Sequence, residues 1–409
     1  MEYIDAIEFM KKSYDKEIRL GLERIKELLE LLGNPQDNLK FVHVAGTNGK
    51  GSTSTALSNI LKESGKKTGL FISPFVVDFR ERVQINGEYI SESDLARLTE
   101  KISLIVPKVE KDVEDNITEF EFITALMFVY FKEQNCDVVV LEVGLGGRLD
   151  STNVIKNPLA TVITKIALEK CGIIKEGCPV ITSSLQNPVA LDVIKKISGE
   201  KFSPINIGDV SAIENLSIMP FGSKFTYKGI GVEVNLPGSH QIENMTTVIE
   251  TALLIGCTKT AIVNGIAKTK FPARLEIISK SPLVIIDGAH NENGADVLAD
   301  YLDKNNITPI TILGMMADKN CHAVIEKISS RSKGLYTVKV EGNSRAESAE
   351  NLAAMAKKHC SDVNAEPDYK SALSAAANKA KEFSLPLLIC GSLYLASDIR
   401  DLAINYFKK

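Results

Sequence analysis

The sequence predicts an α/β protein of two domains, and three features lead to this prediction. An apolar strand at 41–45 runs through a glycine-rich loop into a helix. A second buried strand, 137–142, ends on an acid. After residue 281, strands and helices alternate, which is typical of a Rossmann-like parallel sheet. A length of 409 residues also favours two domains over one.

Composition narrows the class of protein. Apolar residues make up 44% and charged residues 24%, as in ordinary globular proteins. A net charge of −4 argues against binding nucleic acid through a broad basic surface. The apolar run 125–131 is too short to cross a bilayer, and the charged first dozen residues do not form a signal peptide. Seven cysteines without a CxxC pair suit free thiols, so we expect a cytoplasmic protein with no membrane partner.

Taken in order, residues 1–33 are predicted to be helical. Leucine and isoleucine recur at helical spacing from 20 to 32, and Gly33-Asn34-Pro35 ends the pattern. We expect these helices to pack against the rest of the domain and to have a structural role only.

The loop 46–51 and the start of the next helix form the first candidate site. Its glycines allow backbone N–H groups to converge on one anion, and the helix start adds free donors. Lys50 would bring a positive charge to phosphates, and the hydroxyl of Ser52 or Thr53 could hold a phosphate-bound Mg²⁺. We expect the helix to open at Ser52 and to end near Gly65. An ordinary turn is the alternative, and the convergence of so many donors argues against it.

The run HVAGTNGKGST resembles the phosphate loop of the folylpolyglutamate synthase/dihydrofolate synthase family, in the Mur ligase superfamily. The glycine between Lys50 and Ser52 is similar to the folate branch, whereas the peptidoglycan branch usually runs GTNGKT. The resemblance implies a P-loop-type Mur ligase ATPase domain that binds ATP and Mg²⁺. The implied nucleotide-binding residues in this loop are Thr47, Asn48, Gly49, Lys50, Gly51, Ser52 and Thr53, with Ser52 also near the metal.

Two further segments of the first half carry the resemblance. After an expected strand at 66–72, SPF…ERVQINGEYIS is similar to the family pattern, which implies that Ser73 helps hold magnesium. Phe75 stands where the family usually has a histidine. A buried helix is expected at 118–131, where Phe120 and Glu121 resemble an element beside the pterin pocket. The alternative for Glu121 is an acid that only stabilises the helix start.

The strand that ends at Glu142 carries the second strong signal. Ligands bind beyond the carboxyl ends of parallel strands, so an acid there can face the Mg²⁺ of a nucleotide on the neighbouring loop. The following GLGGRLDSTN also matches the family. The resemblance implies that Glu142 binds magnesium and that Leu149, Asp150 and Ser151 lie along the pteroate site.

The segment after Thr164 departs from the family. Relatives carry a loop there with a metal-binding histidine, and about a dozen residues are missing, the size of one functional loop. A strand at 161–164 passes into a helical pattern at 166–170 without a turn residue. Either the protein has a true deletion or the sequence omits a segment, and we favour the omission because a deletion would cost a metal ligand.

The element EKCGI is similar to the family's EKAGI, whose lysine is carbamylated by CO₂ and serves the metal site. The resemblance implies this modification at Lys170. Attack on CO₂ requires a neutral amine, so burial or a cationic neighbour must lower the pKa of this lysine.

The rest of the chain, from residue 178 onward, is predicted to contain both strands and helices. Strands are expected at 178–184 and within 200–236, and LPGSHQIEN resembles an element whose asparagine, here Asn244, contacts adenine. His240 receives no catalytic role. In the last part we expect strands at 282–286, 310–313, 334–340 and 387–390, and helices at 293–304, 321–329, 346–359, 370–382 and the C-terminal end.

The domain junction is expected at FPARLE, which resembles the family's W.GR.E. The domains would then be 1–273, which binds ATP and folate, and 274–409, Rossmann-like. The resemblance implies that Arg274 meets the ATP phosphates, and a guanidinium suits that role. DGAHN matches a superfamily element, which implies that Asp287 contacts the ribose and that His290 lies beside the nucleotide.

The implied reaction is ATP-dependent amide formation in folate biosynthesis and one-carbon metabolism. Lys50, Lys170 and Arg274 would carry catalysis, and the partners would be small molecules alone: ATP, L-glutamate and a folate or pteroate. A monomer suffices. The alternatives are a peptidoglycan Mur ligase, a nucleotide switch without ligase activity, and a non-catalytic nucleotide-binding relative.

Overall fold

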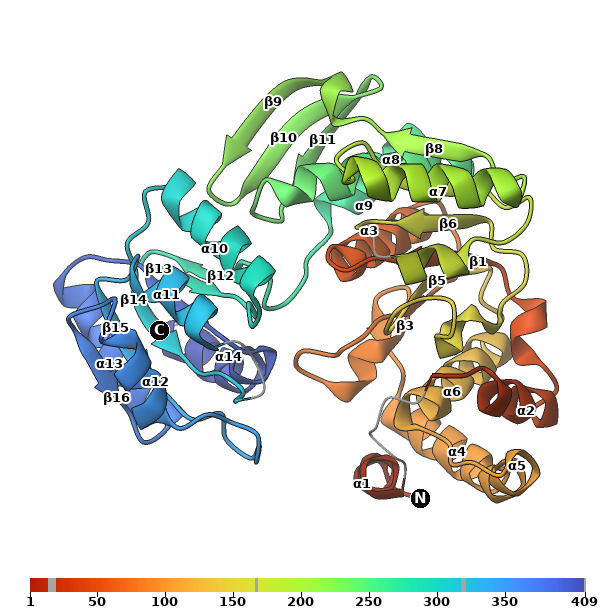
Figure 1. Cartoon of the computed structure of the whole chain (residues 1–409), viewed down its shortest axis with the longest axis horizontal. Coiled ribbons are helices and arrows are strands. Elements are labelled where there is room, and N and C mark those ends of the chain that lie inside the picture. The colour runs from red at the N-terminus through yellow and green to blue at the C-terminus, as the bar shows by residue number, and fades with distance from the viewer. Residues whose placement is uncertain (14–19, 166–167, 318–320, 408–409) are drawn as a thin grey trace. The chain divides into compact units, whose positions relative to one another are not determined.

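The computed structural model describes residues 1–13, 20–165, 168–317 and 321–407, and these form two compact units (Figure 1). Unit 1 comprises Met1–Ser217, Lys224–Asn235 and Gln241–Lys270. Unit 2 comprises Ile218–Ser223, Leu236–His240 and Phe271–Lys409. The main division thus follows Lys270, where we expected it after residue 273, and two short segments that precede it in the chain join unit 2.

Unit 1 is built on a mostly parallel sheet of eight strands in the order β4-β3-β2-β5-β1-β6-β7-β8. The five pairs from β2 to β8 are parallel, and β3 and β4 form an antiparallel edge. Because β1 lies centrally between β5 and β6, the loop that follows it has a strand end on either side. The strands are β1 Phe41–Ala45, β2 Thr68–Phe71, β3 Val83–Ile85, β4 Glu88–Tyr89, β5 Val138–Glu142, β6 Ala160–Ile163, β7 Val180–Ser183 and β8 Ile205–Gly208.

Helices cover this sheet, and a small second sheet, β11-β10-β9, follows β8 in the chain (Figure 1). Its strands are β9 Ile213–Met219, β10 Gly222–Tyr227 and β11 Ile230–Val234. The α-helices are α1 Tyr3–Ser13, α2 Glu23–Leu31, α3 Lys50–Glu63, α4 Glu92–Ser103, α5 Val106–Val113, α6 Glu119–Glu133, α7 Pro188–Glu200, α8 His240–Leu254 and α9 Lys259–Ala267. Short 3₁₀ helices are η1 Pro35–Asn38, η2 Phe79–Arg82, η3 Ser151–Val154, η4 Leu168–Ile173 and η5 Val210–Ala212.

Helix α6 forms the centre of the main core of unit 1. Its residues from Glu121 to Phe131 are all buried, as expected for a helix without a polar face. The ring of Phe128 meets Phe41 of β1 edge-on at 5.7 Å, and the ring of Phe131 occupies the space beside Gly69 of β2. Burial of this helix therefore fixes the central strands that carry the candidate site.

Unit 2 is a Rossmann-like sheet of six strands in the order β12-β13-β17-β14-β15-β16, parallel except for β12. The strands are β12 Glu276–Lys280, β13 Leu283–Ile286, β14 Ile310–Leu313, β15 Gly334–Thr337, β16 Val363–Ala365 and β17 Leu387–Cys390. The helices around it are α10 Glu292–Lys304, α11 Cys321–Ser329, α12 Ala349–Ala356, α13 Tyr369–Glu382 and α14 Leu393–Phe407.

The fold class is confirmed, and most expected elements are present within one to three residues of their predicted bounds. Three predictions need correction. The helix after the phosphate loop begins at Lys50 and not at Ser52, the helix expected at 346–359 spans only Ala349–Ala356, and the strand expected at 334–340 ends at Thr337. The helical pattern at 166–170 falls partly on residues 166–167, outside the described residues, and a 3₁₀ helix follows from Leu168.

Several elements were not predicted: strands β3, β4, β12 and β16 and helices α4, α5, α7 and α9. The strands β12 and β16 are short, partly exposed edge strands, which carry a weak apolar signal. Among the described residues, none of the helices has the length and hydrophobicity needed to cross a lipid bilayer.

Candidate active site

The loop between β1 and α3 is built around two glycines. Gly49 caps α3 with φ +84°, a left-handed conformation that suits glycine, and Lys50 is then the first residue of the helix. A Cβ at Gly49 would lie 2.5 Å from the Asn244 Oδ1, and one at Gly46 would overlap the hydroxyl of Thr164. The loop is therefore closely packed against α8 and the end of β6, with its backbone N–H groups at a helix start.

Lys50 and Glu142 come together at the carboxyl edge of the sheet. The Lys50 Nζ donates to the Gly46 carbonyl at 3.0 Å and lies 3.9 Å from the Glu142 Oε1. Glu142 ends β5, which pairs with β1 and β2, and its carboxylate is buried. The backbone N–H of Ser73, just after β2, donates to the Glu142 Oε2 at 3.4 Å. The structure thus gathers Lys50, Glu142 and Ser73 at one point.

These donors fit a magnesium ion that is shared with a nucleotide. In the described part of the chain, no three His, Cys, Asp or Glu side chains gather into a metal cage. Mg²⁺ does not need one, because one or two carboxylates, waters and phosphate oxygens complete its octahedron. Glu142 could supply a buried carboxylate, and Ser73 and Ser52 could supply hydroxyls.

Helix α8 contributes a residue that the sequence reasoning missed. The Gln241 Nε2 donates to the Ser52 Oγ at 3.3 Å, and the Gln241 Oε1 accepts from the Asn244 Nδ2 at 2.9 Å. All three side chains are buried. Asn244 was expected to contact adenine, and here its Oδ1 lies beside Gly49 of the phosphate loop. The signal for Gln241 was its place in the motif HQIEN, three residues before Asn244.

Lys170, in η4, lies within electrostatic reach of the phosphate loop. Partial burial lowers the pKa of Lys170, and the positive charge of Lys50 lowers it further. The carboxylates of Glu169 and Asp150 act in the opposite direction. The structure therefore supplies both conditions that favour a neutral amine at this lysine, burial and a cationic neighbour.

Of the residues expected along the pteroate site, two have carboxylates that are engaged within the protein. Asp150 is buried, which raises its pKa, and it accepts from the Leu145 N–H, the Thr152 N–H and the Thr152 hydroxyl. Through these hydrogen bonds Asp150 stabilises the conformation of the loop after β5. Glu121 completes a capping box with Thr118 and pairs with Arg24 at 3.0 Å, so the structure favours its stabilising role at the helix start.

The other pteroate candidates differ in exposure. The Phe120 ring packs over Gly144, where a Cβ would overlap it, and lies 5.9 Å from the Phe71 ring. Leu149 is 38% exposed, while Ser151 is buried. Phe120 therefore lies next to the end of β5, close along the chain to Glu142, and Leu149 offers an apolar surface to solvent.

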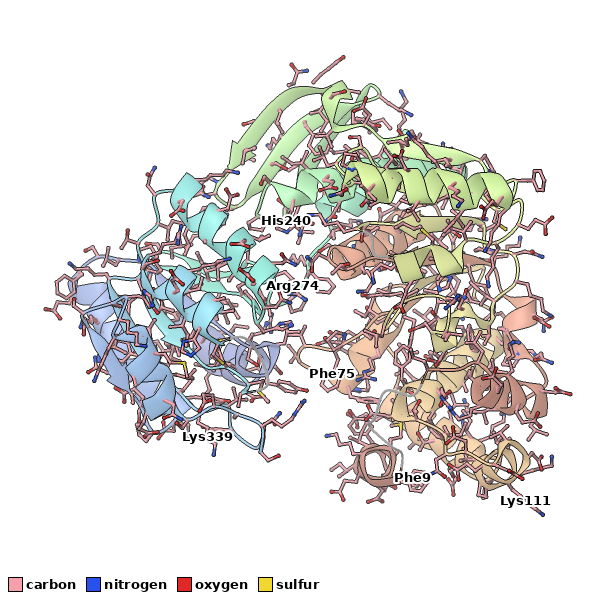
Figure 2. The ribbon with its side chains drawn as sticks, viewed as in Figure 1. Phe9, Phe75, Lys111, His240, Arg274 and Lys339 are labelled. Atoms are coloured by element: carbon pink, nitrogen blue, oxygen red, sulfur yellow. The ribbon has the colours of Figure 1, made fainter. Side chains whose placement is uncertain are left out.

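Phe75 occupies the position where the family usually has a histidine (Figure 2). Its ring packs on Phe79 at 5.6 Å, and the Arg82 guanidinium lies 5.2 Å from its centroid. Arg82 also pairs with Glu119 at 3.6 Å. The phenyl ring thus joins an aromatic–guanidinium cluster beside Ser73, which is a packing role.

In unit 2, Arg274 is held between two residues with left-handed backbone, Ala273 at φ +52° and Leu275 at φ +48° (Figure 2). The Asp287 carboxylate, just after β13, accepts from the Leu275 N–H at 2.7 Å and the Ala289 N–H at 2.8 Å. Burial raises the pKa of Asp287, and Arg274 opposes that shift. The FPARLE and DGAHN segments therefore form one structure at the carboxyl end of β13.

His290 belongs to the same structure. Its Nδ1 lies 2.8 Å from the Gly288 carbonyl, which can only accept, so Nδ1 carries the proton. Its Nε2 then faces the Asn291 Nδ2 at 3.5 Å. His290 is thus positioned by backbone, with its ring at the start of α10.

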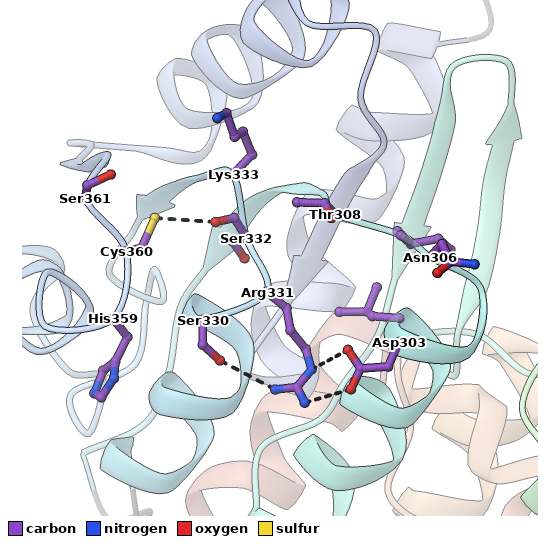
Figure 3. Close-up of a pocket in the computed structure, with 12 residues that line it drawn as sticks. Asp303, Asn306, Thr308, Ser330, Arg331, Ser332, Lys333, His359, Cys360 and Ser361 are labelled. Atoms are coloured by element: carbon purple, nitrogen blue, oxygen red, sulfur yellow. Dashed lines mark hydrogen bonds and ion pairs between the residues drawn. The ribbon is translucent and has the colours of Figure 1, made fainter.

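A cavity of about 590 Å³ lies at the opposite edge of the unit 2 sheet (Figure 3). Its lining comes from loops that precede β14, β15 and β16, where α10, α11 and α12 end. Arg331 is paired there with Asp303 at 2.7 Å, and Lys333 and His359 follow helix ends. Positive side chains complement the partial negative charge of helix C-termini, which gives them a structural reason to be there. This cavity is therefore separate from the carboxyl-edge site.

Comparisons with known proteins agree with the site. The family model of the dihydrofolate synthetase C-terminal domain matches residues 274–403. The chain is 35% identical to a folylpolyglutamate synthase of Lacticaseibacillus casei, over 98% of both chains, and 32% identical to a dihydrofolate synthase/folylpolyglutamate synthase of Bacillus subtilis, over 97% of this chain and 98% of the relative. It also resembles the structure of Mycobacterium tuberculosis folylpolyglutamate synthase complexed with ADP and AMPPCP, with a TM-score of 0.89 and 26% identity over 98% of this chain and 99% of that one.

These relatives are named as folate-directed synthases, which favours the folate branch over the peptidoglycan branch and over a non-catalytic protein. The chain therefore belongs to the folylpolyglutamate synthase/dihydrofolate synthase family and is an ATP-dependent ligase that adds L-glutamate to a folate-type carboxylate.

Proposed function

We propose that the chain transfers the γ-phosphoryl group of Mg²⁺-ATP to a folate carboxylate and that L-glutamate then opens the acyl phosphate. The observation that supports this most directly is the approach of the Lys50 Nζ to within 3.9 Å of the buried Glu142 carboxylate, at a helix start. In the first step, a carboxylate oxygen attacks the γ-phosphorus and ADP leaves. In the second, the glutamate amine attacks the acyl carbon, a proton is lost and inorganic phosphate leaves.

In this proposal the residues of unit 1 neutralise charge and position groups. The loop amides and Lys50 hold the β- and γ-phosphates. Glu142, Ser73 and Ser52 would hold Mg²⁺, which would offset charge on the transferring phosphoryl group. Ser52 accepts from Gln241, and its hydroxyl oxygen keeps a second lone pair for the metal.

We also propose that Lys170 is carbamylated. Its neutral amine would attack CO₂, forming an N–C bond and releasing one proton. Burial and Lys50 both lower the pKa of Lys170, which raises the fraction of neutral amine. The product carries a negative charge that Lys50 would attract, so the same neighbour favours both the reaction and its product.

Three residues of unit 2 are also proposed to bind the nucleotide. Arg274 would bind the phosphates, Asp287 the ribose hydroxyls, and His290 would lie beside the nucleotide, while Asn244 of α8 would approach the adenine. Asp287 is supported because its carboxylate is oriented by two backbone N–H groups. One chain carries every proposed residue, so a monomer is sufficient for the proposed activity. The cysteines of the described residues are free thiols, which suits the proposed cytoplasmic location.

The test is product formation. Purified protein is mixed with Mg-ATP and L-glutamate, with dihydropteroate or tetrahydrofolate added in turn, and ADP and product mass are measured. A glutamate adduct with both acceptors supports a bifunctional enzyme, and an adduct with one names the activity. No adduct from a protein whose intact mass matches the 409 residues would refute the proposal and show that the missing loop after Thr164 is a true deletion.

A further inference from the structure

One buried side chain, Asn153, connects the two loops that surround Lys170. Asn153 is 6% exposed and lies in η3, at the end of the loop that follows β5. Its Nδ2 donates to the carbonyl of Arg148 at 2.9 Å and to the carbonyl of Gly172 at 3.1 Å. Arg148 belongs to the loop after β5, and Gly172 belongs to η4. A single amide thus spans both loops.

The chemistry of its partners requires a hydrogen-bond donor at this position. Both partners are backbone carbonyl oxygens, which only accept, so the nitrogen of the side chain must face them. The Asn153 Oδ1 is buried and, within the described part of the chain, has no hydrogen-bond partner. An aspartate of the same shape would place a charged oxygen against two carbonyl oxygens.

Two further contacts close the same junction. The Lys175 Nζ donates to the Asn153 carbonyl at 3.1 Å, and the Arg148 N–H donates to the Glu169 carbonyl at 3.2 Å. The loops are also in backbone contact, because a Cβ at Gly147 would lie 2.7 Å from the Glu169 carbonyl oxygen and 3.0 Å from the Lys170 Cα. A shift of either loop must therefore move Lys170.

We propose that Asn153 is a positioning residue that fixes Lys170 by clamping the η4 segment to the loop after β5. It acts through the backbone, because its amide nitrogen donates to two backbone carbonyls. The inference rests on the proposed role of Lys170 in catalysis. It adds that the geometry of this lysine is set by an amide seventeen residues earlier in the chain, and that the amide nitrogen, rather than the size of the side chain, is what matters.

The test compares Asn153→Asp with the unaltered protein. We expect kcat to fall by about 10²-fold, the loss that a misplacement of about 1 Å causes, while KM for ATP changes by less than about 2-fold. The ¹³C resonance of a lysine carbamate, formed under ¹³CO₂, should be lost or shifted. The matched control is Asn305→Asp in unit 2, where the Asn305 Nδ2 also donates to a backbone carbonyl, that of Tyr301, at 2.8 Å. This control should keep kcat.

A folded Asn153→Asp protein with unaltered kcat and carbamate resonance would overturn the proposal. So would a variant that only melts at a lower temperature while each folded molecule keeps its kcat, because that result describes a structural role alone. If Asn153→Asp does not fold, Lys175 provides the second test. Lys175→Met removes one contact of the clamp and should lower kcat, whereas Lys175→Arg keeps a donor and should restore it. Equal kcat in both Lys175 variants would overturn the clamp.

The outcomes separate this inference from the proposed function. Absence of a glutamate adduct from the unaltered protein refutes the proposed function. A normal adduct from the unaltered protein, together with full activity of Asn153→Asp, refutes the clamp alone.

Discussion

Replacing Glu121 by glutamine tests whether the acid at the start of α6 stabilises the protein or serves the substrate. Glu121 is 1% exposed, and both of its oxygens lie within 3.1 Å of the Arg24 Nε. It also accepts from the Thr118 N–H at 2.9 Å and from the Thr118 hydroxyl at 2.8 Å. Glutamine keeps the shape of the side chain, and it removes the charge that faces Arg24.

The structure sets the size of the effect. Removing one partner of a buried ion pair costs about 3–5 kcal/mol, because the other charge stays buried. Arg24 keeps a second partner, Asp115, at 2.6 Å, so we expect the lower end, about 3 kcal/mol of the free energy of unfolding. At about 2–4 °C per kcal/mol for a unit of this size, the unfolding midpoint of unit 1 should fall by about 6–12 °C.

The assay is differential scanning calorimetry of the full chain, combined with KM for the folate substrate well below the transition. The control is Asp115→Asn, since that carboxylate is 36% exposed and its loss should cost about 1 kcal/mol or less. KM for folate should stay within about 2-fold in both variants. A Glu121→Gln protein that melts normally and shows a tenfold higher KM for folate would refute the reasoning and assign the carboxylate to the substrate.

Three further predictions concern the loops. Lys50→Ala and Glu142→Gln should each lower kcat by at least about 10²-fold without unfolding the protein, and near-native turnover of either in the ADP-release assay would contradict the phosphate-loop mechanism. Burial lowers the pKa of Lys175 to about 8, below its ordinary value of 10.5, so the unfolded chain binds more protons between these values and stability should rise with pH from about 8 to about 10.5. Lys175→Met should remove that rise in urea unfolding, and an unchanged slope would contradict the assignment. Gly172→Ala should destabilise unit 1 by about 1–3 kcal/mol, because the new Cβ would lie 2.5 Å from the Arg148 Cα, and a midpoint equal to that of the unaltered protein would show that the loops can separate freely.

The elements that the sequence predicted well are those whose signal is local. The strand, glycine loop and helix around Lys50 lie in one stretch of chain, and so do the strand that ends at Glu142 and the alternating elements of unit 2. The start of α3 was placed two residues late because Ser52 is a good capping residue. Gly49 in the left-handed region caps the helix instead, and a Cβ at this position would lie 2.5 Å from the Asn244 Oδ1.

The partners of buried polar side chains could not be predicted in this way. Glu121 pairs with Arg24, which lies 97 positions earlier, and Asn153 donates to Gly172 on another loop. Neither pair has a spacing that a period or a motif could reveal. The packing of α2 against α6, and of η3 against η4, decides which carboxylates pair with other residues of the protein. The carboxylates that do not pair in this way stay available to a ligand.

The sequence by itself determined the α/β class and the motifs that identify the family, because each rests on neighbouring residues and on hydrophobic period. It placed the domain junction after residue 273, whereas the main division in the structure follows Lys270. Only the tertiary structure decided that Lys50 meets Glu142, that Glu121 and Asp150 are engaged within the protein, and that Asn153 donates to the carbonyl of Gly172. The physical reason is that hydrogen bonds and ion pairs act over a few ångströms in space, so their partners are set by strand order and burial.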